Sequence, residues 1–170
     1  MSASASATAL PGLAVLEQTP IIIEKILWAA NDDLMQWKPA AERWSIGEVL
    51  AHLADVEVVF RGRVQKMLDQ DNPRIEPFEP KKSYEGKARE NLKLFCHERD
   101  RTLSWLRYVP AGMAARTGQH PELGAISVGH SMNSWACHDL GHIRQVLELY
   151  RARAFYPGVG PFQKYYNLKP

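Results

Sequence analysis

Three histidines in this sequence are spaced so that their side chains could reach one metal ion. His138 and His142 stand four residues apart in a stretch with helical periodicity, so their side chains point within roughly 40° of each other. Their Cβ atoms are then about 6 Å apart, which allows two imidazoles to bind one divalent ion. His52 lies in a second stretch with a strong helical pattern and could supply a third imidazole.

The histidine pair on its own is weak evidence of metal binding. Six histidines in a chain of 170 residues produce such a pair by chance roughly one time in five. Two unrelated histidines, one buried and one at the surface, are therefore the alternative to a metal site. The third histidine, on another predicted helix, shifts the balance toward metal binding.

Three neutral imidazoles without a thiolate suit a divalent transition metal such as zinc, nickel, iron, cobalt or manganese. Three protein ligands with an open position are typical of catalytic rather than structural metal sites. Carboxylates often orient the ligating imidazoles, and those close enough in sequence for this role are Glu48, Asp55 and Asp139. Two further histidines that could line the pocket are His120 and His130.

Two helices must position the three histidines. Ser45 and Glu48 have the spacing of a capping box, which predicts that a helix begins at Ile46, and apolar residues continue at helical spacing to Leu68. A second helix is predicted from Val128, after the possible cap Ser127, to about residue 153.

The rest of the chain predicts two more helices and no strand. One begins at Thr19 and Pro20, and it is followed so closely by the helix at Ile46 that we expect the two to pack antiparallel. The other runs from about Tyr84 to Pro110, and loops fill 71–83 and 111–126. Four amphipathic helices predict an all-α fold, a four-helix bundle with long inter-helix loops. We expect a flexible leader over residues 1–18 and a single domain over 19–170.

Composition excludes several classes of function. Hydrophobic residues make up 45% of the chain and charged residues 24%, as in ordinary globular proteins. The net charge of +2 is too small to favour nucleic acid as a partner. No apolar run reaches the roughly 18 residues of a membrane span. Two cysteines, Cys96 and Cys137, suggest a reducing cytoplasm, although a bridge between them stays open.

Two segments resemble a known family. The run from Trp44 to Asp55, with its capping box and His52, and the run from His138 to Gln145 are similar to the paired motifs of the DinB/YfiT-like metalloenzymes, the DinB superfamily. The resemblance implies a four-helix bundle, often a homodimer, that holds zinc or nickel through His52, His138 and His142. Characterised members include transferases and isomerases that use small thiols such as bacillithiol, mycothiol or glutathione.

The expected function is therefore that of a divalent-metal-dependent enzyme acting on a small molecule. Thiol S-transfer with a low-molecular-weight thiol and hydrolysis both fit the same three imidazoles. The alternative is a non-catalytic bundle of the stress type that binds a metal or a ligand.

Overall fold

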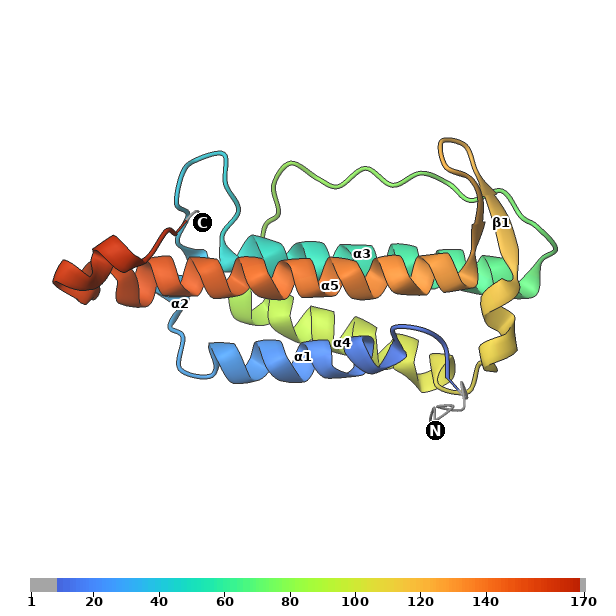
Figure 1. Cartoon of the computed structure of the whole chain (residues 1–170), viewed down its shortest axis with the longest axis horizontal. Coiled ribbons are helices and arrows are strands. Elements are labelled where there is room, and N and C mark those ends of the chain that lie inside the picture. Colours follow the sequence, from blue (N-terminus) through green and yellow to red (C-terminus); the bar gives the residue numbers. More distant parts are fainter. Residues whose placement is uncertain (1–8, 169–170) are drawn as a thin grey trace.

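The fold is built from long helices, and the computed structural model describes residues 9–168. The helices are α1 (Leu13–Leu27), α2 (Asp32–Gln36), α3 (Ile46–Asp69), α4 (Ala88–Leu106) and α5 (Val128–Tyr150) (Figure 1). A 3-10 turn (Ala111–Ala115) and a hairpin of β1 (Thr117–His120) and β2 (Gly124–Ser127) precede α5, and irregular helical turns (Arg151–Phe155 and Tyr156–Tyr165) follow it. The prediction of an all-α four-helix bundle with long loops is confirmed.

The capping box fixes the start of α3. The Ser45 hydroxyl accepts a hydrogen bond from the Glu48 amide at 3.2 Å, and the Glu48 carboxylate accepts one from the Ser45 amide at 2.9 Å. Both side chains are buried, so these bonds replace water at amides that the helix itself leaves unpaired. The start of the helix in turn sets the depth at which His52 enters the bundle.

We expect Ser45→Ala to lower the free energy of unfolding by about 1 kcal/mol, because the first turn of α3 loses its cap. Denaturant unfolding would measure the change. Ser134→Ala, at an exposed position inside α5, is the matched control and should change stability by no more than about 0.5 kcal/mol. Equal effects of the two substitutions would show that the cap contributes nothing.

The predicted start of the first helix at Thr19 is wrong, because α1 begins at Leu13. Leu13 and Leu16 are buried, so part of the expected leader is packed into the bundle. Residues 1–8 of that leader lie outside the described residues. The apolar contacts of these leucines extend the helix toward the N-terminus beyond the proline that seemed to start it.

Pro20 is tolerated inside α1 because another side chain satisfies the carbonyl that it leaves free. Proline has no amide hydrogen, so the carbonyl of Leu16, four residues earlier, has no helical partner. Arg99 of α4 donates to this carbonyl at 2.7 Å. The proline thus leaves free the Leu16 carbonyl, which accepts a hydrogen bond from Arg99 of α4.

The order of the helices in the bundle differs from our expectation. α1 packs against α5 and α4, and α3 packs against α4 and α5, so α1 and α3 lie diagonally opposite each other. The predicted antiparallel contact between the first helix and the long second one is therefore wrong. Residues 28–45, with α2, are long enough to carry the chain across the end of the bundle.

α3 and α4 run parallel, which requires a long return segment. Asn91, near the start of α4, donates to the carbonyl of Gly47 near the start of α3, and the later residues Arg61 and Glu98 form an ion pair. Residues 70–87, which we call the strap, carry the chain back along the bundle (Figure 1). The strap covers a flank of α3, the helix that carries His52.

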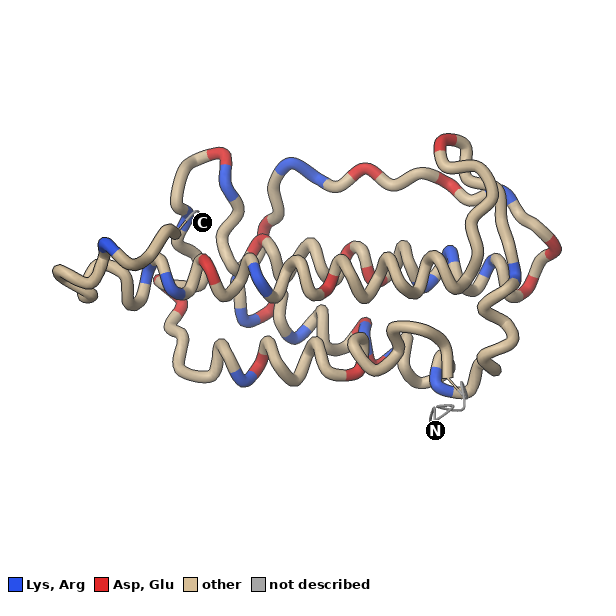
Figure 2. The backbone as a smooth tube through the Cα atoms, viewed as in Figure 1, with Lys and Arg blue, Asp and Glu red and all other residues tan. Residues whose placement is uncertain are grey.

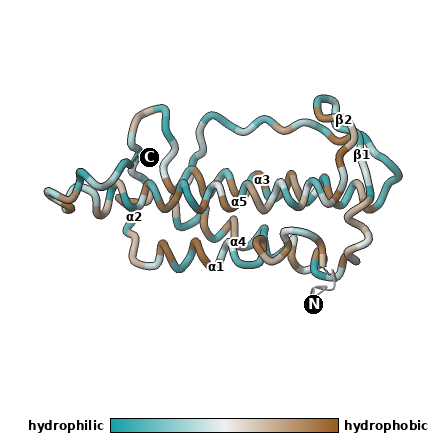
Figure 3. Tube along the Cα trace, in the orientation of Figure 1, coloured by the Kyte–Doolittle hydropathy of each residue, from teal (hydrophilic) through white to brown (hydrophobic). Residues whose placement is uncertain are grey.

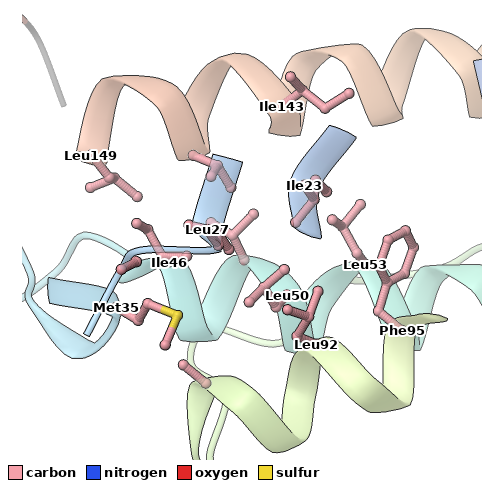
Figure 4. Packing of buried hydrophobic residues seen from close by; sticks show 14 of the residues in the cluster. Ile23, Leu27, Met35, Ile46, Leu50, Leu53, Leu92, Phe95, Ile143 and Leu149 are labelled. Atoms are coloured by element: carbon pink, nitrogen blue, oxygen red, sulfur yellow. The ribbon is translucent and has the colours of Figure 1, made fainter. Parts of the chain in front are cut away.

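The core lies between the inward faces of the four long helices. Figure 4 shows part of it, where side chains from α1, α3, α4 and α5 meet. In Figure 3 apolar stretches recur along the helices, whereas the strap is mostly polar. None of the described helices is apolar over a length sufficient to cross a membrane.

The segment 111–126, which we predicted to be a loop, contains the hairpin. Its strands have only four residues each, too short for an alternating pattern to be recognised in the sequence. The Ile75 amide donates to the Gln119 carbonyl at 2.8 Å, so the hairpin also anchors the first part of the strap.

Candidate metal centre

Three imidazoles meet between α3 and α5. The Nε2 atom of His138 lies 3.0 Å from Nε2 of His52 and 3.1 Å from Nε2 of His142. One nitrogen of each ring lies within 4.8 Å of the corresponding nitrogens of the other two. Antiparallel packing of α3 and α5 brings His52 to the pair that the four-residue spacing places on one face of α5.

The surroundings keep the three imidazoles neutral. Burial, followed by the neighbouring His142, lowers the pKa of His52 to about 4. Burial and the two other rings lower the pKa of His138 to about 3, and burial also lowers the pKa of His142. Because only a neutral imidazole offers a lone pair to a metal, these pKa values favour binding at neutral pH.

The second nitrogen of two rings has a partner that sets the position of the proton. Nδ1 of His142 lies 2.9 Å from the amide oxygen of Gln145, and Nδ1 of His52 lies 2.9 Å from the Tyr84 hydroxyl. An amide oxygen only accepts, so Nδ1 of His142 donates and the lone pair is on Nε2. The Tyr84 hydroxyl can itself donate to Asp55, at 3.5 Å, while it accepts from His52.

These contacts fit a divalent ion held by three Nε2 atoms. At His142, and at His52 when Tyr84 donates to Asp55, the proton lies on Nδ1, which leaves Nε2 free toward the common point. Nδ1 of His138 is buried without a hydrogen-bond partner among the described residues. The set of three neutral nitrogen donors is one that zinc, nickel and related metals bind.

Sequence reasoning missed Tyr84 and Gln145. Gln145 could have been found, because it stands three residues after His142 on a predicted helix and so shares its face. Tyr84 could not, because we assigned it to the start of a helix, whereas it lies in the strap. Nothing local in the sequence indicates that the strap passes over His52.

The carboxylates expected beside the histidines occupy different places. Glu48 completes the capping box and forms an ion pair with Lys38 at 2.8 Å. Asp139 forms an ion pair with Arg99 at 2.8 Å. These carboxylates are thus bonded to other groups than the three rings. Asp55 is linked to His52 only through Tyr84.

Of the two further histidines expected near the pocket, one lines the cavity and the other does not. His120 is buried and lines a cavity together with the three imidazoles. Its Nδ1 accepts from the Glu122 amide at 3.3 Å, so the neutral ring carries its proton on Nε2. His130 is exposed and forms a capping box with Ser127 at the start of α5.

Two cavities reach the imidazoles. The first has a volume of about 540 Å³ and lies between α3, the strap and the hairpin. Its lining includes all three imidazoles and Trp44, Val56, Val59, Phe60, Arg63, Phe78 and His120. The second, of about 620 Å³, reaches His138 and His142 and is lined by Arg43, Gly141, Arg144, Gln145, Glu148 and Asn167.

We expect Gln145→Ala to weaken metal binding by about 10- to 100-fold, because Nδ1 of His142 loses the acceptor that orients its ring. Competition with a chelating dye would measure the affinity. Gln163→Ala, which removes an amide that bonds only to the Tyr156 carbonyl among the described residues, is the control. Unchanged affinity in Gln145→Ala would show that this contact does not orient the imidazole.

Comparison with known proteins supports this description. A protein of Oceanobacillus iheyensis named "putative metal-dependent hydrolase" is 25% identical over 139 residues, which are 79% of this chain and 81% of the relative. The solved structure of YfiT from Bacillus subtilis, described as "a probable metal-dependent hydrolase with an unusual four-helix bundle topology", superimposes with a TM-score of 0.71 at 22% identity, over 83% of this chain and 85% of that one. The sequence model of the DinB superfamily matches residues 16–146, and the chain belongs to that superfamily.

Proposed function

We propose that this protein is a divalent-metal-dependent hydrolase that acts on a small molecule. The observation that carries the proposal is the convergence of three Nε2 atoms in the wall of a cavity of about 540 Å³. That volume suits a small organic substrate. The similarity to relatives named as metal-dependent hydrolases supports the same reaction class.

The residues of the metal centre have two roles in this proposal. His52, His138 and His142 would hold the ion, with zinc or nickel as the first candidates, and Tyr84 and Gln145 would orient two of the rings. The bound ion would supply Lewis-acid chemistry, which activates a nucleophile and polarises a carbonyl group.

The protein supplies further groups for binding. The rings of Trp44 and Phe60 line the cavity, so they would contact apolar parts of the substrate and keep bulk water away. His120 carries its proton on Nε2 when neutral and would donate a hydrogen bond to a polar group of the substrate.

Ester hydrolysis by metal-loaded protein tests the proposal. Purified protein would be stripped of metal, reloaded separately with zinc and nickel, and assayed with a panel of p-nitrophenyl esters. We expect activity only after reloading, and its loss in His138→Ala. Metal binding without turnover of any ester in the panel would instead favour the non-catalytic metal-binding alternative.

A second candidate is S-transfer from a low-molecular-weight thiol, and the second cavity favours it. In such a transfer the thiol would bind at the ion and the electrophile would have to reach its sulfur, and His138 and His142 line both cavities. A reloaded sample would be assayed with glutathione or bacillithiol and an electrophilic dye. Thiol-dependent product above that of the metal-free protein would favour the transferase, and ester hydrolysis without thiol would favour the hydrolase.

The homodimer and the cytoplasmic location expected from the sequence stay predictions. Light scattering of the purified protein would determine whether it is a dimer.

A further inference from the structure

We propose that the cavity beside the imidazoles takes an elongated substrate whose far end is an anionic group, and that Arg63 binds this group. The inference rests on the proposed function, because it assumes that the reacting end of the substrate lies at the three histidines. It adds a substrate class to that function: carboxylate- or phosphate-terminated molecules with an apolar middle.

Arg63 and His52 lie on one face of α3 and line the same cavity, so we take them as the two ends of the stretch of cavity between them. Eleven residues separate them, which is three turns and a rotation of roughly 20°. Their Cα atoms are therefore about 16 Å apart along the helix. Both side chains line the cavity, so a molecule that filled it lengthwise would contact both.

The wall between these two ends is apolar. Val56, Val59 and Phe60 of α3 form one side, and Pro77 and Phe78 of the strap form the other. A hydrocarbon or aromatic spacer fits such a wall, because it buries apolar surface without leaving polar groups unpaired. These five residues offer a ligand no polar side chain, so its polar groups would be bound by the imidazoles, His120 and Arg63.

Within residues 9–168, Arg63 has no charged partner. Its one hydrogen bond among the described residues goes from Nη2 to the Glu76 carbonyl at 2.8 Å, and its Nε is buried without a partner. Burial lowers its pKa, and no nearby carboxylate counters this effect. Arg61 on the same helix differs, because it forms an ion pair with Glu98 at 2.6 Å.

Two carboxylates near the cavity do not take the place of the anion. Glu79 and Glu122 also line the cavity, but both are exposed and neither forms an ion pair with Arg63. Charged residues of both signs are scattered along the helices and the strap (Figure 2), so a local contact rather than a broad positive field must select the anion. A guanidinium fork offers that contact to a carboxylate or a phosphate.

Binding of two carboxylic acids of equal carbon number to zinc-loaded protein tests the proposal without any turnover. Suberate and octanoate have the same chain, but only suberate carries a second carboxylate. We expect calorimetry to show that suberate binds about tenfold or more tightly than octanoate, because one carboxylate meets Arg63 while the other lies at the histidines. A phosphate-terminated alkyl carboxylate of similar length, in a third titration, would show which anion binds more tightly.

Two substitutions on α3 separate a direct contact from an effect of net charge. Arg63→Gln should abolish the preference for suberate, and Arg63→Lys should keep part of it, because a cation remains without the planar fork. Lys66→Gln removes the same charge one turn further along α3, at a residue that does not line this cavity, and should leave the preference unchanged. Thermal melts of all variants would show whether the loss of the bond to Glu76 unfolds the protein.

A preference for suberate that persists in Arg63→Gln, or the absence of a preference in the wild type, would overturn the proposal. A crystal structure of the zinc-loaded protein with suberate is independent of any substitution. A carboxylate within hydrogen-bond distance of Arg63 supports the inference, and a carboxylate elsewhere contradicts it. Failure to hydrolyse esters would count against the proposed function alone, because these measurements record binding only.

Discussion

His52→Ala is expected to retain less than about a tenth of the metal content of the wild type after dialysis. The substitution removes one of three nitrogen donors, and the remaining two lie on α5 alone. Loss of a direct ligand should exceed the roughly 10- to 100-fold weakening that follows loss of an orienting partner. The ion would also no longer link α3 to α5, so zinc should raise the melting temperature of the variant less than that of the wild type.

His97→Ala is the matched control, because His97 is exposed on α4 and remote in sequence from the motifs of the site. Its metal content should equal that of the wild type within error. Elemental analysis of dialysed samples would measure all three proteins. Full metal retention in His52→Ala would mean that the ion does not lie between α3 and α5, and that the spacing of His138 and His142 is a helical coincidence.

The parts of the fold that the sequence predicted are those determined by local interactions. The capping box at Ser45 and Glu48 is such a case, because both hydrogen bonds join residues three positions apart. The helix of His138 and His142 is another, since its periodicity extends over many turns. Local rules could therefore place each histidine on the correct helix, although they could not by themselves bring the three together.

The parts that the sequence did not predict depend on distant contacts. The diagonal placement of α1 and α3 follows from which apolar faces pack together, and the helical period is the same for any such arrangement. The strap has no periodic pattern, so its path over α3 could not be predicted, and neither could the contact between Tyr84 and His52. The place of Arg63 in the cavity likewise depends on residues of the strap, which are distant in sequence.

One guanidinium in the core joins all four long helices. Arg99 of α4 donates to Glu57 of α3 at 2.9 Å, to Asp139 of α5 at 2.8 Å and to the Leu16 carbonyl of α1 at 2.7 Å. The three charged side chains are essentially inaccessible to solvent. Burial raises the pKa of Glu57, whereas the two carboxylates together outweigh burial and raise the pKa of Arg99.

We expect Arg99→Met to lower the free energy of unfolding at pH 7 by about 3–5 kcal/mol. The apolar side chain leaves Glu57 and Asp139 buried without their cation, and removal of one partner of a buried ion pair has an effect of this size. The Leu16 carbonyl also loses its donor, and Pro20 cannot replace it. Denaturant unfolding would measure the difference from the wild type.

The pH dependence identifies the cause of this loss. Burial already raises the pKa of Glu57 and Arg99 opposes this shift, so without Arg99 the pKa of Glu57 should rise further above its unfolded value. The folded variant would then hold a proton that the unfolded chain releases. The deficit should therefore be large at pH 7 and shrink as the pH falls to about 4, where Glu57 is mostly protonated in both the folded and the unfolded state.

Arg101→Met, at an exposed position two residues further along α4, is the control and should lower the free energy of unfolding by no more than about 1 kcal/mol. Adding Glu57→Gln and Asp139→Asn to Arg99→Met should restore part of the stability at pH 7, because neutral side chains are buried more easily than carboxylates. A deficit that stayed constant with pH and was not relieved by these additions would mean that Arg99 acts through its packing volume alone.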